Sequence, residues 1–402
     1  MNQAPKTREP LFHLVKRDVT KKWIPWAIRA GAVVAAFILL GLMSLISLGV
    51  NPFKVYKYMF EGAFGDSFRV MRLLRDLAIL LLFALAVTPA FKMKFWNIGA
   101  EGQVLMGGFA CMICMFYLGG KVNDVLLIFI SLAASVLMGA IWAGIPALFK
   151  AKWNTNETLF TLMMNYVAIQ IILYTIKIWA PGGTGTLTPS AYGNLPAIGG
   201  EHFWFSIIVA LVMTAVMFVY LRYTKHGYEI NVVGESENTA RYIGINVRKV
   251  VIRTLLLSGL ICGLTGFLLV AGIDHTVSST TAGGRGFTAI LVSWLAKFNP
   301  IAMIFTSLLV VFLSKGMDEV MTQVGVTNSF FSQVVTGITF LMIIGCEFFI
   351  NYRVVFRHRK NDEAAPAAPI PEAAADTAAP APTTEEVPIP SETTQANAAE
   401  EE

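Results

Sequence analysis

Asn97-Ile98-Gly99-Ala100-Glu101-Gly102-Gln103 is the stretch of sequence that decides how this chain folds. Its seven residues include one carboxylate, two carboxamides and two glycines, and they lie between the apolar runs 77–91 and 104–118. Polar groups at bilayer depth are costly unless they face protein or water. The stretch therefore predicts a lined cavity or pathway inside a membrane protein.

The composition of the whole chain agrees with a membrane protein. Of its 402 residues, 55% are hydrophobic and only 14% are charged, and the mean hydropathy is +0.61. Uncharged runs long enough to cross about 30 Å of hydrocarbon as helices occupy 30–50, 125–149, 158–176, 203–221 and 254–273, and another lies inside 320–346. We expect an all-α, polytopic integral membrane protein with about ten transmembrane or partly spanning helices.

Shorter apolar segments lie between these spans, at 77–91, 97–118, 286–296 and 299–314. Short or glycine-interrupted segments in both halves of a transporter are typical of broken helices around a site near the membrane midplane. The sequence therefore predicts broken helices and an internal pseudo-repeat.

The distribution of basic residues predicts three regions and their orientation. Residues 1–29 form a basic segment, 30–350 the transmembrane domain, and 351–402 a tail. The positive-inside rule places both termini in the cytoplasm. One loop disagrees with the rule, because residues 51–76 carry five cations and would face outward: Lys54, Lys57, Arg69, Arg72 and Arg75.

The tail from residue 361 onward differs from the rest of the chain. It contains seven prolines, ten acidic residues and no Lys or Arg. We expect this segment to be disordered, because it cannot bury a core. Without its ten acids the formal charge of the chain is about +15, as 31 cations face 16 acids. Basic loops that meet anionic membrane lipid account for this charge, and nucleic-acid binding is not expected.

The chain has no motif typical of an enzyme. No phosphate-cradling loop and no nucleophile elbow occurs, and Cys111 and Cys114 lie one turn apart without a nearby pair of histidines. We expect no catalytic residue, no metal and no cofactor in this chain. If ATP drives its function, a separate subunit hydrolyses it.

A cytoplasmic loop at 222–253 is the best candidate for contact with such a subunit. It contains Gly234-Glu235-Ser236-Glu237-Asn238-Thr239-Ala240-Arg241-Tyr242-Ile243-Gly244-Ile245. Ser236 or Asn238 can cap a short helix that Gly244 ends. Such a helix is the right size to dock in a partner's groove, although an ordinary surface helix has the same pattern.

Several blocks in this order resemble the permease subunits of ABC importers for branched-chain amino acids and simple sugars, and most closely the nucleoside branch. They are 95–103, 156–166, 234–245, and 284–290 followed by Asn299-Pro300. The resemblance covers about residues 30–350, while Lys92-Met93-Lys94 departs from the family's small residues. It implies contact with the ATPase through Gly234, Glu235, Ser236, Asn238, Ala240, Arg241 and Gly244.

The resemblance also implies partners and a location. The partners are a second, related permease, two ATP-binding subunits or one double ATPase, and an extracytoplasmic substrate-binding lipoprotein. The location is the bacterial cell membrane, where the chain contacts lipid.

Five residues are candidates for the substrate pathway: Asn97, Glu101, Gln103, Asn165 and Phe287. Carboxamides offer the donors and acceptors that ribose hydroxyls or base edges require. Glu101 could accept hydrogen bonds from hydroxyls, but an acid at a helix start is equally consistent with a dipole role. Phe287 could stack on a base, although aromatic residues more often pack.

The expected function is ATP-driven import of nucleosides delivered by a binding protein. Ribose-like sugars are the second expectation for the same role. From another class, an ion-coupled secondary transporter would also place broken helices at the midplane. Uptake that survives ATP depletion but is abolished by a protonophore would favour that alternative.

Overall fold

We describe the protein from a computed structural model, over residues 12–16, 23–180, 187–198, 203–326, 333–334, 337–339, 341–342, 345 and 352–356. Residues 14–354 form one compact unit. Two short strands, β1 (Phe12–Lys16) and β2 (Tyr352–Phe356), pair in a two-stranded sheet. The tail predicted to be disordered, 361–402, lies outside the described residues.

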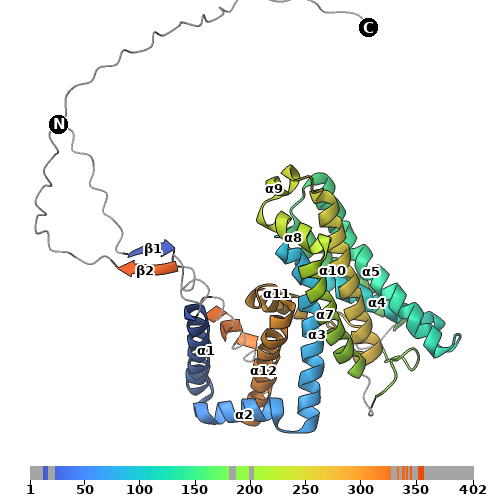
Figure 1. The fold of residues 1–402 in the computed structure, drawn as a ribbon. Coiled ribbons are helices and arrows are strands. Elements are labelled where there is room, and N and C mark those ends of the chain that lie inside the picture. The colour runs from blue at the N-terminus through green and yellow to red at the C-terminus, as the bar shows by residue number, and fades with distance from the viewer. Residues whose placement is uncertain are drawn as a thin grey trace, which may run out of the picture. The chain divides into compact units, whose positions relative to one another are not determined.

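Helices make up nearly all of the compact unit (Figure 1). They are α1 (Ile24–Leu48), α2 (Pro52–Phe64), α3 (Ser67–Lys92), α4 (Ala100–Leu118), α5 (Asp124–Trp153), α6 (Glu157–Trp179), α7 (Trp204–Tyr223), α8 (Lys225–Glu235), α9 (Glu237–Tyr242), α10 (Val247–Leu269), continued by a π-helical turn (Val270–Asp274), α11 (Arg285–Leu295) and α12 (Pro300–Val324). Seven helices among the described residues are long and apolar enough to cross a membrane: α1, α4, α5, α6, α7, α10 with its π turn, and α12. The predicted all-α membrane fold is confirmed.

Two of the four predicted short segments are the uncharged parts of longer helices. Segment 77–91 belongs to the 26-residue α3, and 299–314 belongs to the 25-residue α12. Both helices continue past the uncharged run because their charged residues find partners inside the protein. Segment 286–296 remains short, as the 11-residue α11.

Glycines bring the central helices α4, α5 and α10 into close contact. A Cβ atom at Gly263 of α10 would overlap the Ser135 carbonyl of α5, and one at Gly266 would overlap the Val104 carbonyl of α4. Gly107 of α4 also faces the Gly263 backbone. Small residues let helix backbones approach where lipid gives no hydrophobic driving force between helices.

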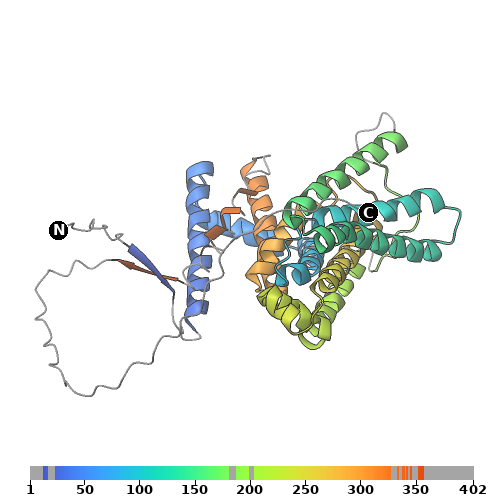
Figure 2. The same cartoon turned by 90° about the horizontal axis from the view of Figure 1, so that it is seen from above.

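Helices α1, α2 and α12 share a second apolar cluster, in which α2 runs between α1 and α3 in both views (Figure 1, Figure 2). The buried members are Leu40, Val55, Met59, Leu313, Met317 and Val320. The other side of α1 is apolar and exposed, with Val34, Ile38, Leu42, Leu45 and Ile46. This face suits lipid or another membrane subunit.

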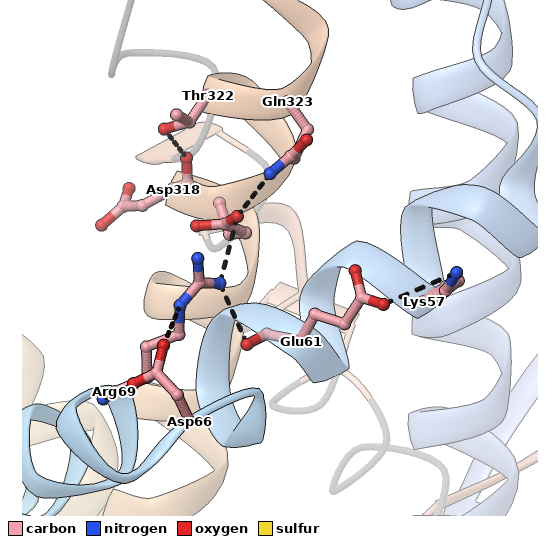
Figure 3. A network of polar contacts seen from close by, with 8 residues as sticks. Lys57, Glu61, Asp66, Arg69, Asp318, Thr322 and Gln323 are labelled. Carbon is pink, nitrogen blue, oxygen red and sulfur yellow. Dashed lines mark hydrogen bonds and ion pairs between the residues drawn. The ribbon is translucent and has the colours of Figure 1, made fainter.

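Acidic partners explain much of the charge excess in the loop 51–76 (Figure 3). The guanidinium of Arg69 lies 3.2 Å from Asp66 and 3.1 Å from Glu319 of α12, and Lys57 lies 3.6 Å from Glu61. Arg75 pairs with Asp76 at 3.2 Å. Counting cations alone therefore overstates the free positive charge of this loop.

Candidate functional site

The polar stretch forms the turn that leads into α4, and its two carboxamides bind each other. Asn97 is fully buried, and its Oδ1 accepts hydrogen bonds from the Gly99 amide and from Gln103 Nε2, both at 3.1 Å. The Nδ2 of Asn97 donates to Ser258 Oγ of α10 at 3.1 Å. Asn97 and Gln103 thus join the start of α4 to α10.

Asn165 of α6 hydrogen bonds to the backbone of the same turn and so connects the turn to α6. Its Oδ1 accepts a hydrogen bond from the Gly102 amide at 2.8 Å, and its Nδ2 donates to the Ile98 carbonyl at 2.9 Å. Because a Cβ atom at Gly102 would lie 2.8 Å from Asn165 Oδ1, glycine is needed for this approach. The Ile98 amide donates to Thr161 Oγ1 of α6 at 3.2 Å.

Glu101 holds the start of a different helix, α11. Its Oε1 accepts from the Gly284 amide and its Oε2 from the Gly286 amide, each at 2.7 Å, and the side chain is 8% exposed. A carboxylate compensates the free amides and the positive end of a helix dipole. The sequence left open whether Glu101 interacts with a helix dipole. In the structure it does so at the N-terminus of α11, and it also lies in the first turn of α4.

Helix α11 crosses only part of a membrane. Its 11 residues rise about 16 Å, half of the hydrocarbon thickness. Near its other end, the rings of Trp294 and Trp96 lie 5.6 Å apart. The helix therefore begins against the buried Glu101 and ends beside Trp96, in the turn that precedes α4.

A cavity of about 660 Å³ opens beside the start of α11. Its lining includes Asp76, Arg285, Phe287, Thr288, Lys315 and Asp318. Of the five predicted pathway residues, Phe287 lines this cavity with a half-exposed ring, and Glu101 supports its wall through Gly284. Asn97, Gln103 and Asn165 lie instead in the hydrogen-bonded turn.

A buried carboxylate surrounded by cations forms the polar side of the cavity. Asp76 of α3 lies 2.8 Å from Lys315 Nζ of α12, 3.2 Å from Arg75 Nε and 3.9 Å from Arg285 of α11. Asp76 and Lys315 each lie nine residues, about 14 Å, from the adjacent ends of their helices, at Ser67 and Val324. Three helices therefore meet on one carboxylate inside the protein.

Sequence reasoning missed Asp76 and Lys315, although a signal was available. Each follows or precedes a long uncharged run, and ionisable residues at such positions mark functional sites in membrane proteins. When the end of each uncharged run is taken as the end of a helix, Asp76 and Lys315 are assigned to the membrane surface.

The short capped helix predicted in the loop 222–253 is present as α9, and its role in coupling stays a prediction. Ser236 caps it by accepting a hydrogen bond from the Thr239 amide at 3.3 Å, and Gly244 follows it with φ +86°. Glu235, Asn238 and Arg241 are exposed. Ala240 is fully buried.

Two further features of this loop concern its contacts. At the end of α9, the apolar side chains of Tyr242 and Ile243 are exposed, at 92% and 50%. Gly234 is buried against the Lys92 carbonyl at the end of α3, where a Cβ atom would overlap that oxygen. The loop containing α9 thus contacts the chain five residues before Asn97.

Helix α8, which precedes α9, is fixed to α7 through His226. The His226 ring hydrogen bonds to the Tyr220 hydroxyl, and burial lowers the pKa of His226. A neutral ring at this position requires no charged partner.

The fold and this site define a polytopic helical permease, with a half-length helix beside a polar cavity and a short capped helix on one face. The chain belongs to the family described as branched-chain amino acid transport system / permease component, whose sequence profile matches residues 69–344. This family selects the ABC permease over the ion-coupled alternative.

Curated relatives cover most of the chain. The glucose ABC transporter permease protein TsgB13 of Haloferax volcanii is 30% identical over 89% of this chain and 97% of its own length. The guanosine ABC transporter permease protein NupP of Bacillus subtilis is 27% identical over 72% of this chain and 84% of its own. The nucleoside ABC transporter permease protein NupB of Lactococcus lactis is 26% identical, over 78% and 89%.

Proposed function

We propose that this chain is the permease subunit of an ATP-driven importer that translocates nucleosides. The single observation that carries the proposal is the half-helix α11, anchored at its buried start by Glu101 and bordered by a cavity of about 660 Å³. Broken helices whose ends meet inside the membrane are the usual construction of a translocation site. Membership of the permease family supports the assignment to an ABC importer.

The chemistry of the cavity suits an uncharged, hydrogen-bonding solute with an aromatic part. Phe287 offers a ring face. The charged residues that line the cavity offer acceptors and donors, and their formal charges sum to zero: the acids Asp76 and Asp318 and the cations Arg285 and Lys315. A nucleoside has a base for the ring and hydroxyls for the polar groups. The names of NupP and NupB support this class of substrate.

Simple sugars are the second candidate, favoured by the 30% identity to a permease named for glucose. A sugar would use the same polar groups and would leave Phe287 to pack on an apolar ring face. The substitution Phe287→Leu distinguishes a nucleoside substrate from a sugar substrate, because loss of base stacking costs about 1–3 kcal/mol per base. Nucleoside uptake is expected to fall about fivefold or more at subsaturating substrate, and sugar uptake to change little.

In the proposed assembly, ATP hydrolysis takes place on separate subunits, a second permease completes the pathway, and an extracytoplasmic binding protein delivers the substrate. Helix α9 contacts the ATPase in the cytoplasm through Glu235, Asn238, Arg241 and the neighbouring Tyr242, all of them exposed. Gly234 and Ala240 support α9 from inside. Both termini are cytoplasmic in this proposal.

Uptake of labelled solutes tests the proposed function. Vesicles that carry this chain with its co-purifying subunits are supplied with ATP or a non-hydrolysable analogue, and purine nucleosides, pyrimidine nucleosides, ribose and glucose are compared. ATP-dependent accumulation of a nucleoside is expected. Accumulation of sugars alone would reject the nucleoside assignment, and accumulation without ATP would reject the ABC role.

A further inference from the structure

A small cavity of about 270 Å³ lies where the ends of α3 and α7 meet the start of α12, and we call it the interfacial pocket. The last residue of α3, the end of α7, Asn231 of α8 and the turn 297–300 between α11 and α12 line it. Its volume is below the roughly 300–1,000 Å³ of clefts that enclose drug-sized ligands. The pocket therefore suits one small polar group rather than a whole nucleoside.

Cations form the polar side of this pocket. Lys92 of α3, Arg222 of α7 and Lys297 of the turn belong to its lining, and the described lining contains no acid. Lys92 is half-buried, yet no acidic residue lies within salt-bridge distance of Lys92 or Arg222 in the part of the chain that the structure describes. A cation that is partly withdrawn from water without a counter-charge is costly. The pocket therefore suits an anionic ligand.

Aromatic rings hold Arg222 in place. Its guanidinium carbon lies 5.7 Å from the centre of the Phe218 ring and 5.9 Å from the centre of the Tyr223 ring. Contacts of this kind stabilise a cation, and the N–H groups at the edge of a guanidinium match the oxygens of a phosphate. The amide of Asn231 offers two more donors to the same pocket.

The pocket lies at the level of the membrane surface. Lys92 and Arg222 follow directly on long uncharged runs, and cations at such positions lie at the interface between lipid and water. Beside the pocket, Val216 and Val219 of α7 are exposed on the helix face that continues to Arg222. Phe305, near the start of α12, is also exposed. These apolar side chains suit the acyl chains of a lipid whose headgroup reaches the cations.

We infer that the interfacial pocket binds the phosphate of an anionic phospholipid through Lys92 and Arg222, with the acyl chains along α7 and α12. Basic pockets between membrane helices can hold anionic lipid headgroups. The bound lipid connects α3, α7 and the turn before α12, next to the contact of Gly234 with the Lys92 carbonyl. The inference goes beyond the proposed function, and it holds whichever solute is transported.

Lipid titration followed by native mass spectrometry tests the binding without an uptake assay. The full chain, alone and with its co-purifying subunits, is purified in detergent and supplied with phosphatidylglycerol or with the zwitterionic phosphatidylcholine. We expect phosphatidylglycerol to bind at least about fivefold more tightly. Equal affinities for the two lipids would overturn the inference. Binding to the chain alone but not to the assembled complex would also overturn it and would assign the pocket to a subunit contact.

Matched substitutions locate the bound lipid. Lys92→Gln and Arg222→Gln should each lower the affinity for phosphatidylglycerol about fivefold, because each removes one cation near the phosphate. The controls Lys94→Gln and Lys225→Gln remove exposed cations outside the pocket and should change the affinity less than twofold. Thermal unfolding of each variant verifies that it is folded. Equal effects of the pocket and control substitutions would overturn the site.

Two further measurements distinguish a lipid site from a site for free anions. Inorganic phosphate in large excess should leave phosphatidylglycerol bound, because it lacks the acyl chains, and displacement would overturn the assignment to lipid. In nanodiscs, a photoactivatable phosphatidylglycerol should label 212–223 and 299–305. Arg222→Gln should lower this labelling and leave the labelling of the exposed face of α1 unchanged, whereas an equal decrease at both places would contradict a specific site.

Discussion

At the scale of single residues, the polar stretch 97–103 is an anchoring device more than a lining of the cavity. Asn97 and Gln103 hydrogen bond to each other, Asn165 binds the backbone of Ile98 and Gly102, and Glu101 accepts from the amides of Gly284 and Gly286. Most of this polarity is matched by protein partners, although Oε1 of Gln103 is buried without a hydrogen-bond partner among the described residues. Glu101 positions the start of α11, and Phe287 on α11 lines the cavity.

The first prediction concerns the charge on Glu101. Glu101→Gln replaces one acceptor oxygen by an NH₂ group that cannot accept from a backbone amide, so the free energy of unfolding in detergent should fall by about 1–3 kcal/mol. Uptake should fall while the amount of protein in the membrane stays close to normal. Thermal unfolding and uptake are measured for this variant and for a control, Glu61→Gln, which removes the exposed ion pair between Glu61 and Lys57. Normal uptake by Glu101→Gln would show that the Glu101 carboxylate is not needed to hold the start of α11.

The second prediction concerns the close approach of α11 to α4. In Gly286→Ala the new Cβ atom would lie 2.7 Å from Glu101 Oε2 and 2.8 Å from the Glu101 amide nitrogen, so the two helices must separate. The expected cost is about 1–3 kcal/mol, read from thermal unfolding. Gly31→Ala on α1, where nothing lies within 4 Å, serves as the control. Equal stability of the two variants would contradict the packing described here.

At the scale of elements, three helices depend on one carboxylate. Asp76 on α3 contacts cations on α11 and α12, and the cavity opens between these helices. Removing one member of a buried ion pair is more costly than replacing the whole pair, because it leaves a charge without compensation. The cluster therefore fixes how α11 and α12 sit against α3.

A double-mutant cycle tests this dependence. Asp76→Asn should lower the free energy of unfolding by about 1–3 kcal/mol, because it removes the buried carboxylate that Lys315 and Arg285 share, while Lys315 itself is 34% exposed to the cavity. Adding Lys315→Met to that variant should restore about half of the loss. Stability is read from denaturation in detergent micelles. Additive effects of the two substitutions would show that the pair is not coupled.

The sequence predicted the kind of each element better than its ends. The capped helix at 237–242 and the short helix at 285–295 were both expected, since caps and glycines mark them locally. The lengths of α3 and α12 were not, because Asp76 and Lys315 are stabilised in helix interiors by ion pairs between distant parts of the chain, Asp76 with Arg285 and Lys315 among them. The contact between Glu101 and α11 joins residues 183 positions apart, which no local pattern encodes.

At the scale of the whole molecule, contacts run continuously from the loop 222–253 to the cavity. Gly234 in α8 lies on Lys92 at the end of α3, the turn 93–99 follows, and Glu101 then holds α11. A displacement of α9 by a partner can therefore move the start of α4 and, through it, α11. Ala240 is buried, so an acid at that position would damage the loop itself, whereas Arg241 is exposed and can be changed cleanly.

The central claim is that this permease is driven by ATP through α9, and simultaneous measurement of ATP hydrolysis and nucleoside uptake in proteoliposomes of the assembled complex tests it most directly. For the normal chain, uptake should require ATP and rise with hydrolysis. Arg241→Glu reverses the charge that α9 presents to its partner, and it should lower uptake about tenfold while basal hydrolysis continues. Uptake that persists without ATP, or that is unchanged in Arg241→Glu, would contradict the account.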